Sequence, residues 1–249
     1  MKRFLIIILL GFIMLVSLKA SCGTVKPFGK PPVQAIKIED WVYYHNMSIT
    51  FDGRHYFTIN GGNENSCVLN EYDRNGEYIA DYNVYLDGRS ILYNPKTDLI
   101  YVKIYGTDLY EIDLEYEDAV AYLYDVFAED NSSPAISPDG NFIYELTEGK
   151  VRVIDFETGD LERTIKLEDW YDEHGYKYTI AASEAYLFVW GSEDEVLVYD
   201  LNGKFINEIK MSRLGYSFSL SYCNNMLWIS KDADGAADGE NGYWYGYRF

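Results

Sequence analysis

Carboxylates are the side chains of this sequence whose type and spacing most suggest chemistry. The chain carries 40 acidic residues among 249, and pairs of carboxylates are the groups with which most glycosidases work. Four aspartates recur at similar intervals, each at the end of a short alternating apolar run and before a turn-rich stretch. They are Asp73, Asp113, Asp155 and Asp200, at steps of 40, 42 and 45 residues.

The position of these four aspartates argues for structure rather than catalysis. An aspartate directly before a turn accepts hydrogen bonds from the turn's own N–H groups. Four copies in four repeats serve the repeated unit and not one site. We therefore interpret them as turn caps.

The repeat itself predicts the fold. A period of this length built from short strands is typical of a β-propeller with one four-stranded blade per repeat. The repeat is clearest in residues 133–167, where Ser137-Pro138-Asp139-Gly140 predicts a tight turn. After it, residues 141–146, 151–155 and 161–167 predict three successive strands.

This repeat resembles known propeller families. The run SPDGNFIYELTEGKVRVIDFETGDLERTI is similar to the surface-layer and lactonase-type repeat. The runs YDRNGEYI and YDLNGKFI are similar to NHL-type repeats and to those of lipoprotein propellers from gut bacteria. The resemblance covers residues 45–249, implies a WD-like all-β fold, and includes no catalytic motif.

The last predicted blade lacks one strand. Four full blades precede residues 218–249, which provide only three strands. Residues 33–39 alternate and have no place in the first blade, so we expect them to be the outer strand of the fifth blade and to close the ring, which removes exposed edges. The sequence therefore predicts a five-bladed propeller over residues 33–249.

The N-terminus predicts export. A basic start and the apolar run 4–18 have the form of a signal peptide, and the run is shorter than a membrane-spanning helix requires. Residues 18–23 then resemble a bacterial lipobox, which implies lipid on Cys22, although Lys19 departs from that pattern. The alternative is plain secretion with cleavage near Ala20. Either way, we expect residues 1–21 to be a signal peptide and the Pro- and Gly-rich residues 22–32 to be a tether, which places the protein in the cell envelope, on the outer membrane or in the periplasm.

The net charge limits the partners. At −19, the chain repels phosphate backbones and anionic lipids, so we expect no nucleic-acid partner and no membrane contact except through a lipid. We expect the ligand to be a protein, a peptide or a glycan.

The family resemblance implies that ligands bind at the end of the ring where successive blades are joined. Aromatic side chains beside carboxylates at that end could bind a sugar or a peptide. The alternative is that these aromatic rings only fill the wide end of the central channel. The candidate ligand-binding residues are Trp41, Tyr43, Tyr44, Trp170, Tyr171, His174 and Tyr176.

The alternative function is that of a five-bladed glycosidase. The resemblance to such enzymes implies three carboxylates around a central funnel, and Asp40, Asp87 and Glu129 occupy suitable loops. We prefer a non-catalytic binding or scaffold module, because fold alone does not confer activity and the blades are short and regular.

Metal and thiol chemistry have weaker signals. Asp232, Asp234 and Asp238 offer oxygen ligands for Ca²⁺, but their spacing departs from an EF-hand, and an acidic hairpin loop is the simpler explanation. We therefore expect no cofactor, with Ca²⁺ as the alternative. Cys67 and Cys223 fall at opposite ends of the ring, so we do not expect them to form a disulfide.

Overall fold

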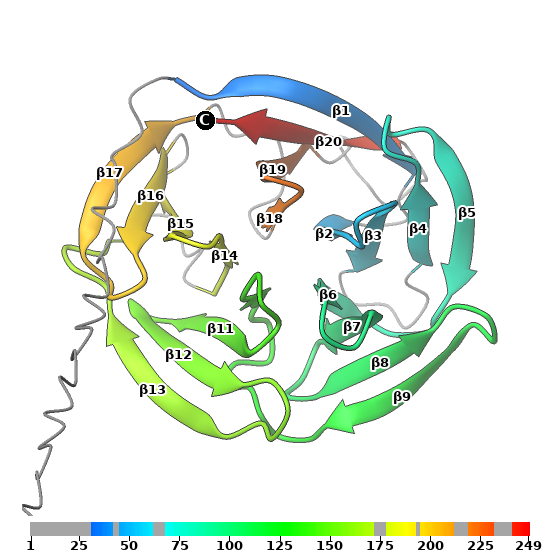
Figure 1. Ribbon diagram of the computed structural model, residues 1–249, viewed down its shortest axis with the longest axis horizontal. Helices are drawn as coiled ribbons and strands as arrows, with labels where there is room; N and C mark the ends of the chain where they lie inside the picture. The colour runs from blue at the N-terminus through cyan, green and yellow to red at the C-terminus, as the bar shows by residue number, and fades with distance from the viewer. Residues whose placement is uncertain are drawn as a thin grey trace, which may run out of the picture.

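The chain forms five four-stranded antiparallel sheets arranged in a ring around a central axis (Figure 1). The computed structural model describes residues 31–41, 45–61, 68–171, 178–192, 195–211, 219–231 and 241–249. No helix long and apolar enough to cross a bilayer occurs in these ranges. The all-β propeller predicted from the repeat is confirmed.

Each of the first four blades is a continuous stretch of chain, and its strands follow one another from the axis outward. Blade one has β2 (His45–Phe51), β3 (Tyr56–Gly61), β4 (Val68–Tyr72) and β5 (Tyr78–Asn83). Blade two has β6 (Gly88–Asn94), β7 (Leu99–Ile104), β8 (Leu109–Asp113) and β9 (Asp118–Leu123). Blade three has β10 (Ala135–Ile136), β11 (Phe142–Thr147), β12 (Lys150–Asp155) and β13 (Leu161–Lys166). Blade four has β14 (Ile180–Ala182), β15 (Tyr186–Ser192), β16 (Glu195–Asp200) and β17 (Phe205–Lys210).

The fifth blade joins the first and last strands of the described chain. It consists of β18 (Leu220–Cys223), β19 (Met226–Lys231), β20 (Asn241–Arg248) and, outermost, β1 (Val33–Trp41). β1 pairs antiparallel with β20 from Val33 opposite Arg248 to Trp41 opposite Asn241, as the blue and red strands of Figure 1 show. The predicted ring closure by an N-terminal strand is confirmed.

The described part of the chain forms five hydrophobic cores, one at each seam between neighbouring blades. Second and third strands are mostly buried, whereas outer strands such as β5 and β13 are mostly exposed. A cluster around Ile59 and Val102 joins blades one and two, for example, and one around Ile38 and Trp228 joins blades five and one. Every blade therefore depends on two neighbours for its apolar contacts.

The repeated aspartates cap turns, as predicted. One carboxylate oxygen of Asp73 accepts hydrogen bonds from the backbone N–H groups of Asn75 and Glu77 at 2.8 and 2.9 Å. Asp113, Asp155 and Asp200 each accept two such bonds in the corresponding turns. These bonds to the charged form lower the pKa of Asp73 and of Asp155.

Hydroxyl groups narrow the channel on the ring axis. The Ser48 Oγ lies 3.5 Å from that of Ser90 and 3.3 Å from that of Ser221, and Ser90 donates to the carbonyl of Pro134 at 2.7 Å. The cavity they leave on the axis has a volume of about 30 Å³, enough for a single water molecule. A ligand larger than water must therefore bind at one end of the ring and not inside it.

Candidate functional site

The ring has two different ends, which we call the loop face and the hairpin face. The loop face carries the connections between blades and between second and third strands, such as residues 84–87, 124–134 and 148–149. The hairpin face carries the inner hairpins, residues 52–55, 95–98, 137–141, 183–185 and 224–225, and the turns of the repeated aspartates. Ligand residues were predicted on the loop face.

Two of the predicted aromatic residues on the loop face are described with their side chains. The Trp170 ring covers Gly149, where an added Cβ would lie 2.7 Å from the ring, and it packs on the apolar seam between blades three and four. Tyr171 is 38 % exposed and donates its hydroxyl hydrogen to Glu195 Oε2 at 2.7 Å. Trp170 thus has a packing role, while Tyr171 is accessible at the surface.

Most of the other predicted site residues lie outside the described residues. Among them are the lipobox Cys22, the aromatic and histidine candidates Tyr43, Tyr44, His174 and Tyr176, and the calcium candidates Asp232, Asp234 and Asp238. For Trp41 we describe only its place at the end of β1. In the described ranges, no group of three or more His, Cys, Asp or Glu side chains is placed to hold a metal ion.

Asp40, the first of the three funnel carboxylates, is completely buried. Its two oxygens accept hydrogen bonds only from side chains: Asn46 at 2.7 Å, Asn70 at 2.7 Å, Tyr72 at 2.5 Å and Trp244 at 2.8 Å. Burial raises the pKa of Asp40, and these donors oppose the rise. With no exposed surface, this carboxylate cannot touch a substrate; it ties the closing strand to blade one.

Asp87 and Glu129, the other two funnel carboxylates, lie on the loop face beside buried basic side chains. Asp87 forms an ion pair with Arg89 at 3.2 Å, and the Arg89 guanidinium lies 5.0 Å from the Tyr105 ring. The backbone carbonyl of Glu129 accepts a hydrogen bond from Lys103 Nζ at 3.1 Å. Their surroundings therefore differ from that of Asp40, and none of the three carboxylates lines the axial cavity or either of the two hairpin-face pockets that are described below.

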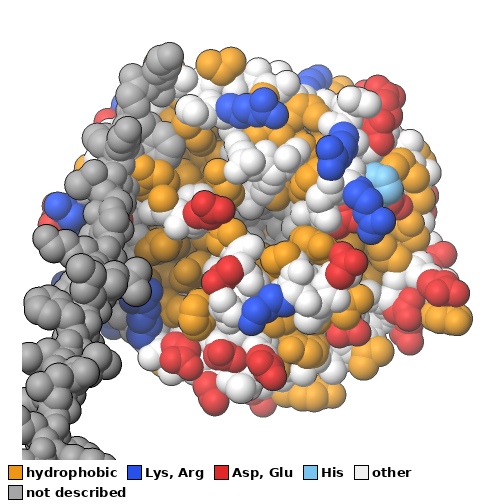
Figure 2. Space-filling model, viewed as in Figure 1, with side chains coloured by type: hydrophobic (Ala, Val, Ile, Leu, Met, Phe, Trp, Pro, Cys, Tyr) orange, Lys and Arg blue, Asp and Glu red, His pale blue; other side chains and the backbone are white. Residues whose placement is uncertain are grey.

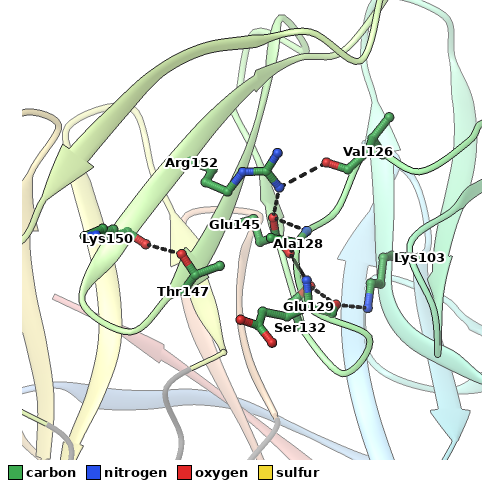
Figure 3. Close-up of polar contacts among 9 residues, drawn as sticks. All are labelled: Lys103, Val126, Ala128, Glu129, Ser132, Glu145, Thr147, Lys150 and Arg152. Carbon is green, nitrogen blue, oxygen red and sulfur yellow. Dashed lines mark hydrogen bonds and ion pairs between the residues drawn. The ribbon is translucent and has the colours of Figure 1, made fainter.

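The connection between blades two and three is held by buried charges from both sides (Figure 3). The fully buried Glu145 carboxylate accepts bonds from the backbone N–H groups of Ala128 and Glu129, from the Ser132 hydroxyl and from Arg152. From blade two, Lys103 donates to two carbonyls of the same connection. Burial lowers the pKa of Lys103 to about 7. Each polar group here has partners in the protein, which indicates a structural clamp.

The hairpin face holds a pocket of about 770 Å³ at the ring axis, within the size range of small-ligand sites. Figure 2 shows this face, with hydrophobic and acidic side chains around the central depression. All five inner hairpins contribute to the wall. Among the described residues, the lining includes six aromatic rings, two carboxylates and no Lys or Arg. The aromatic residues are Phe51, Tyr93, Tyr186, Phe188, Tyr222 and Phe249.

Three of these rings form a stacked wall. The Phe188 ring is stacked on Tyr222 with centroids 5.5 Å apart and on Phe249 with centroids 6.3 Å apart. Phe188 is buried, whereas Phe249 is 39 % exposed. The wall therefore runs from the interior of the ring to its surface, and its outer ring can contact a ligand.

Hydrogen bonds hold the hairpins around the pocket in fixed conformations. Asp52 Oδ1 accepts from the backbone N–H groups of Arg54 and His55 at 2.6 Å each. Asn224 donates to the Tyr56 hydroxyl at 2.5 Å. Asn224 and Asn225 both have positive φ, as a two-residue type I′ hairpin requires. The pocket is thus pre-formed, and a ligand would not have to order its walls.

Cys223 is a free cysteine in the pocket wall. Burial raises the pKa of its thiol, with a hydrogen-bond contact to Trp228 opposing the rise, so the sulfur is protonated and weakly nucleophilic at neutral pH. It lies at the hairpin face, as predicted. Cys67 lies outside the described residues, and the expected absence of a disulfide between the two stays a prediction.

Comparison with known proteins adds information on the fold. No family model matches the chain, and no curated protein does. The tail fibre of Staphylococcus aureus phage P68 is similar in structure, with a TM-score of 0.57 and 13 % identity, over 87 % of this chain and 52 % of that one. The likeness is one of fold. Hydrazine synthase of Kuenenia stuttgartiensis matches with a TM-score of 0.47 and 16 % identity, over 86 % of this chain and 61 % of that one. The chain thus spans about half the length of the tail-fibre chain.

Sequence reasoning missed the hairpin-face pocket. Its residues come from five turns far apart in the chain, and each turn has an ordinary composition. One signal was available: the segments beside these turns are rich in aromatic residues, as in Tyr186, Phe188 and Tyr222. Where inner hairpins surround an axis, such residues must converge.

Proposed function

We propose that this protein is a non-catalytic binding module of the bacterial cell envelope that takes its ligand in the hairpin-face pocket. The observation that carries the proposal is the pre-formed depression of about 770 Å³ with stacked aromatic walls and a few polar groups. Such pockets gain affinity because the apolar wall is already exposed and ordered. A propeller ring is suited to this role, since five rigid hairpins share one axis.

The proposal is tested by blocking the pocket. Ala185 is half-buried and lines it, so Ala185→Trp would fill the space, whereas Ala128 is exposed on the loop face. We expect a glycan array and a peptide array probed with residues 23–249 to show binding that Ala185→Trp abolishes and Ala128→Trp retains. Binding that survives Ala185→Trp would place the site outside this pocket, and binding that only Tyr171→Ala removes would place it on the loop face.

The proposal includes export and a lipid on Cys22. The support is the signal-like N-terminus and the lipobox resemblance, together with a folded body whose first strand begins at Val33, beyond a Pro- and Gly-rich stretch. Metabolic labelling with palmitate should mark the wild type and not Cys22→Ala. Absence of label from both proteins, with the wild type in the soluble exported fraction, would instead indicate plain secretion.

The glycosidase alternative lacks support from the residues that it requires. Asp40 has no exposed surface and accepts hydrogen bonds from four side chains. Asp87 is occupied by Arg89. Glycosidases need two carboxyl groups facing one another across a substrate, so we favour binding over hydrolysis.

A further inference from the structure

The hairpin-face pocket continues into a second pocket between blades three and four. That pocket has a volume of about 590 Å³ and shares four residues of its lining with the first: Ser137, Pro138, Ser183 and Glu184. The two pockets are adjacent, and we treat them together as one groove that runs from the ring axis outward. An elongated groove fits an extended ligand better than a compact one.

The groove is acidic. Among the residues that the structure describes, its lining carries four carboxylates, Asp52, Asp139, Glu162 and Glu184, and one basic side chain, Arg163. Hydrogen bonds from Ser137 and Asn141 lower the pKa of Asp139, which keeps it charged. This local charge has the same sign as the net charge of −19, so the groove repels anions and attracts cations.

Two of these carboxylates are available to a ligand. Glu184 and Glu162 are exposed, and neither has a hydrogen bond or ion pair with any described residue. Asp52 and Asp139, by contrast, are engaged in their own turns, and Arg54 lies 3.8 Å from Asp52. Glu184 belongs to both pockets, so the groove offers one acceptor at its centre and another toward its outer end.

Apolar surface lies along the same path. The stacked rings of Phe188, Tyr222 and Phe249 line the inner pocket, and Phe142 and Leu201 line the outer one. An arginine side chain suits both the aromatic surface and the carboxylates of the groove, because its planar guanidinium stacks on aromatic faces and pairs with carboxylates through two parallel hydrogen bonds.

From this groove we infer the ligand class: an extended peptide segment in which arginine or lysine alternates with apolar residues. The inference rests on the proposed binding function and deepens it. Basic side chains meet Glu184 and Glu162, and the apolar residues between them pack on the aromatic floor. Because the lining carries almost no positive charge, acidic peptides and phosphorylated ligands are excluded.

The test uses two peptides that differ only in charge. The first is acetyl-Arg-Leu-Arg-Leu-Arg-amide, and the second has citrulline, a neutral analogue of similar shape, in place of each arginine. By calorimetry with residues 23–249, we expect the arginine peptide to bind at least tenfold more tightly than the citrulline peptide, and more weakly in 0.5 M NaCl than in 0.05 M.

Paired charge-removal variants separate the groove from the general field of the protein. We expect Glu184→Gln with Glu162→Gln to weaken the arginine peptide at least tenfold. Glu115→Gln with Glu157→Gln removes the same charge from exposed turns of the same face, outside both linings, and should change binding less than twofold. Equal losses in the two double variants, or equal binding of the two peptides, would overturn the inference.

The outcome also distinguishes this inference from the proposed function. If a neutral glycan such as xylohexaose binds, Ala185→Trp abolishes its binding, and the arginine peptide does not bind, then the pocket is a binding site and the peptide class is wrong. If the array and calorimetric experiments detect no ligand for the wild type, both proposals fail.

Discussion

At the scale of single residues, the buried charges of this propeller join segments rather than perform chemistry. Asp40 is the clearest example, because four hydrogen-bond donors from blades one and five contact its one carboxylate. Glu145 and Lys103 do the same for the connection between blades two and three. A buried charge is tolerated only when such partners replace its water.

Replacing Asp40 by asparagine should therefore be costly although the shape is conserved. All four partners donate hydrogens, so the amide NH₂ would face donors and leave buried groups without acceptors. We expect Asp40→Asn to lower the free energy of unfolding by about 3 kcal/mol. Asp113→Asn is the control: an asparagine oxygen can accept the same turn bonds, and urea denaturation should show a change of about 0.5 kcal/mol or less.

Lys103 should make stability depend on pH. Its pKa is about 7 in the folded protein against an ordinary 10.5, so between these values the unfolded chain holds a proton that the folded protein lacks. The free energy of unfolding then rises with pH across this window, by up to about 1.4 kcal/mol per pH unit, and is flat below pH 7. Denaturation at pH 6, 7, 8 and 9 should show this rise relative to Lys103→Met; parallel curves for the two proteins would contradict it.

At the scale of strands and turns, much of the molecule follows from the sequence. In blade three, the alternating runs predicted the second, third and outer strands to within one residue, as in the predicted 161–167 and the observed Leu161–Lys166. The turn aspartates gave the ends of the third strands. The closing strand was predictable because the fifth blade lacked one strand and residues 33–39 alternate.

What could not be predicted depends on contacts between segments distant in the chain. Lys103 lies in a strand whose pattern shows a polar residue but not its burial beneath the connection to the next blade. The hairpin-face pocket requires five turns to meet at an axis. The local sequence pattern shows neither the burial of Lys103 nor the pocket, because both arise only when the ring closes.

The closing strand should be essential to the domain. Deleting residues 23–39 removes most of β1 and exposes the edge of β20, whereas deleting residues 23–31 leaves β1 intact. We expect the longer deletion to lower the melting temperature by more than about 10 °C or to prevent folding, and the shorter one to have little effect. Equal melting temperatures of the two truncated proteins would show that β1 contributes no stability.

One substitution can test the same strand without shortening the chain. Ile38 is fully buried in the seam between blades five and one, so Ile38→Ala should cost about 3 kcal/mol of unfolding free energy. Gln34 is exposed on the same strand, and Gln34→Ala should cost less than about 0.5 kcal/mol. Chemical denaturation of the two variants gives the comparison directly.

At the scale of the whole molecule, the ring differs from a linear array of repeats. In an open array the two end units each have a single neighbour, and stability is approximately a sum over nearest-neighbour contacts. Here each blade packs on two others through five seam cores, and β1 removes the open ends. Among the described residues, no cluster lies within a single blade, so we expect the domain to unfold as one unit.

The distribution of tryptophan makes this cooperativity measurable. The chain has five tryptophans, and none lies in the strands of blades one or two. Val102→Ala at the seam between those blades removes two methyl groups from a fully buried side chain and should cost about 2 kcal/mol. If the ring is cooperative, Val102→Ala lowers the urea midpoint equally whether unfolding is followed by tryptophan fluorescence or by far-ultraviolet circular dichroism. Val120 is 60 % exposed, so the control variant Val120→Ala should leave both midpoints unchanged. A fluorescence midpoint unchanged by Val102→Ala would mean that blades one and two unfold separately from the rest of the ring.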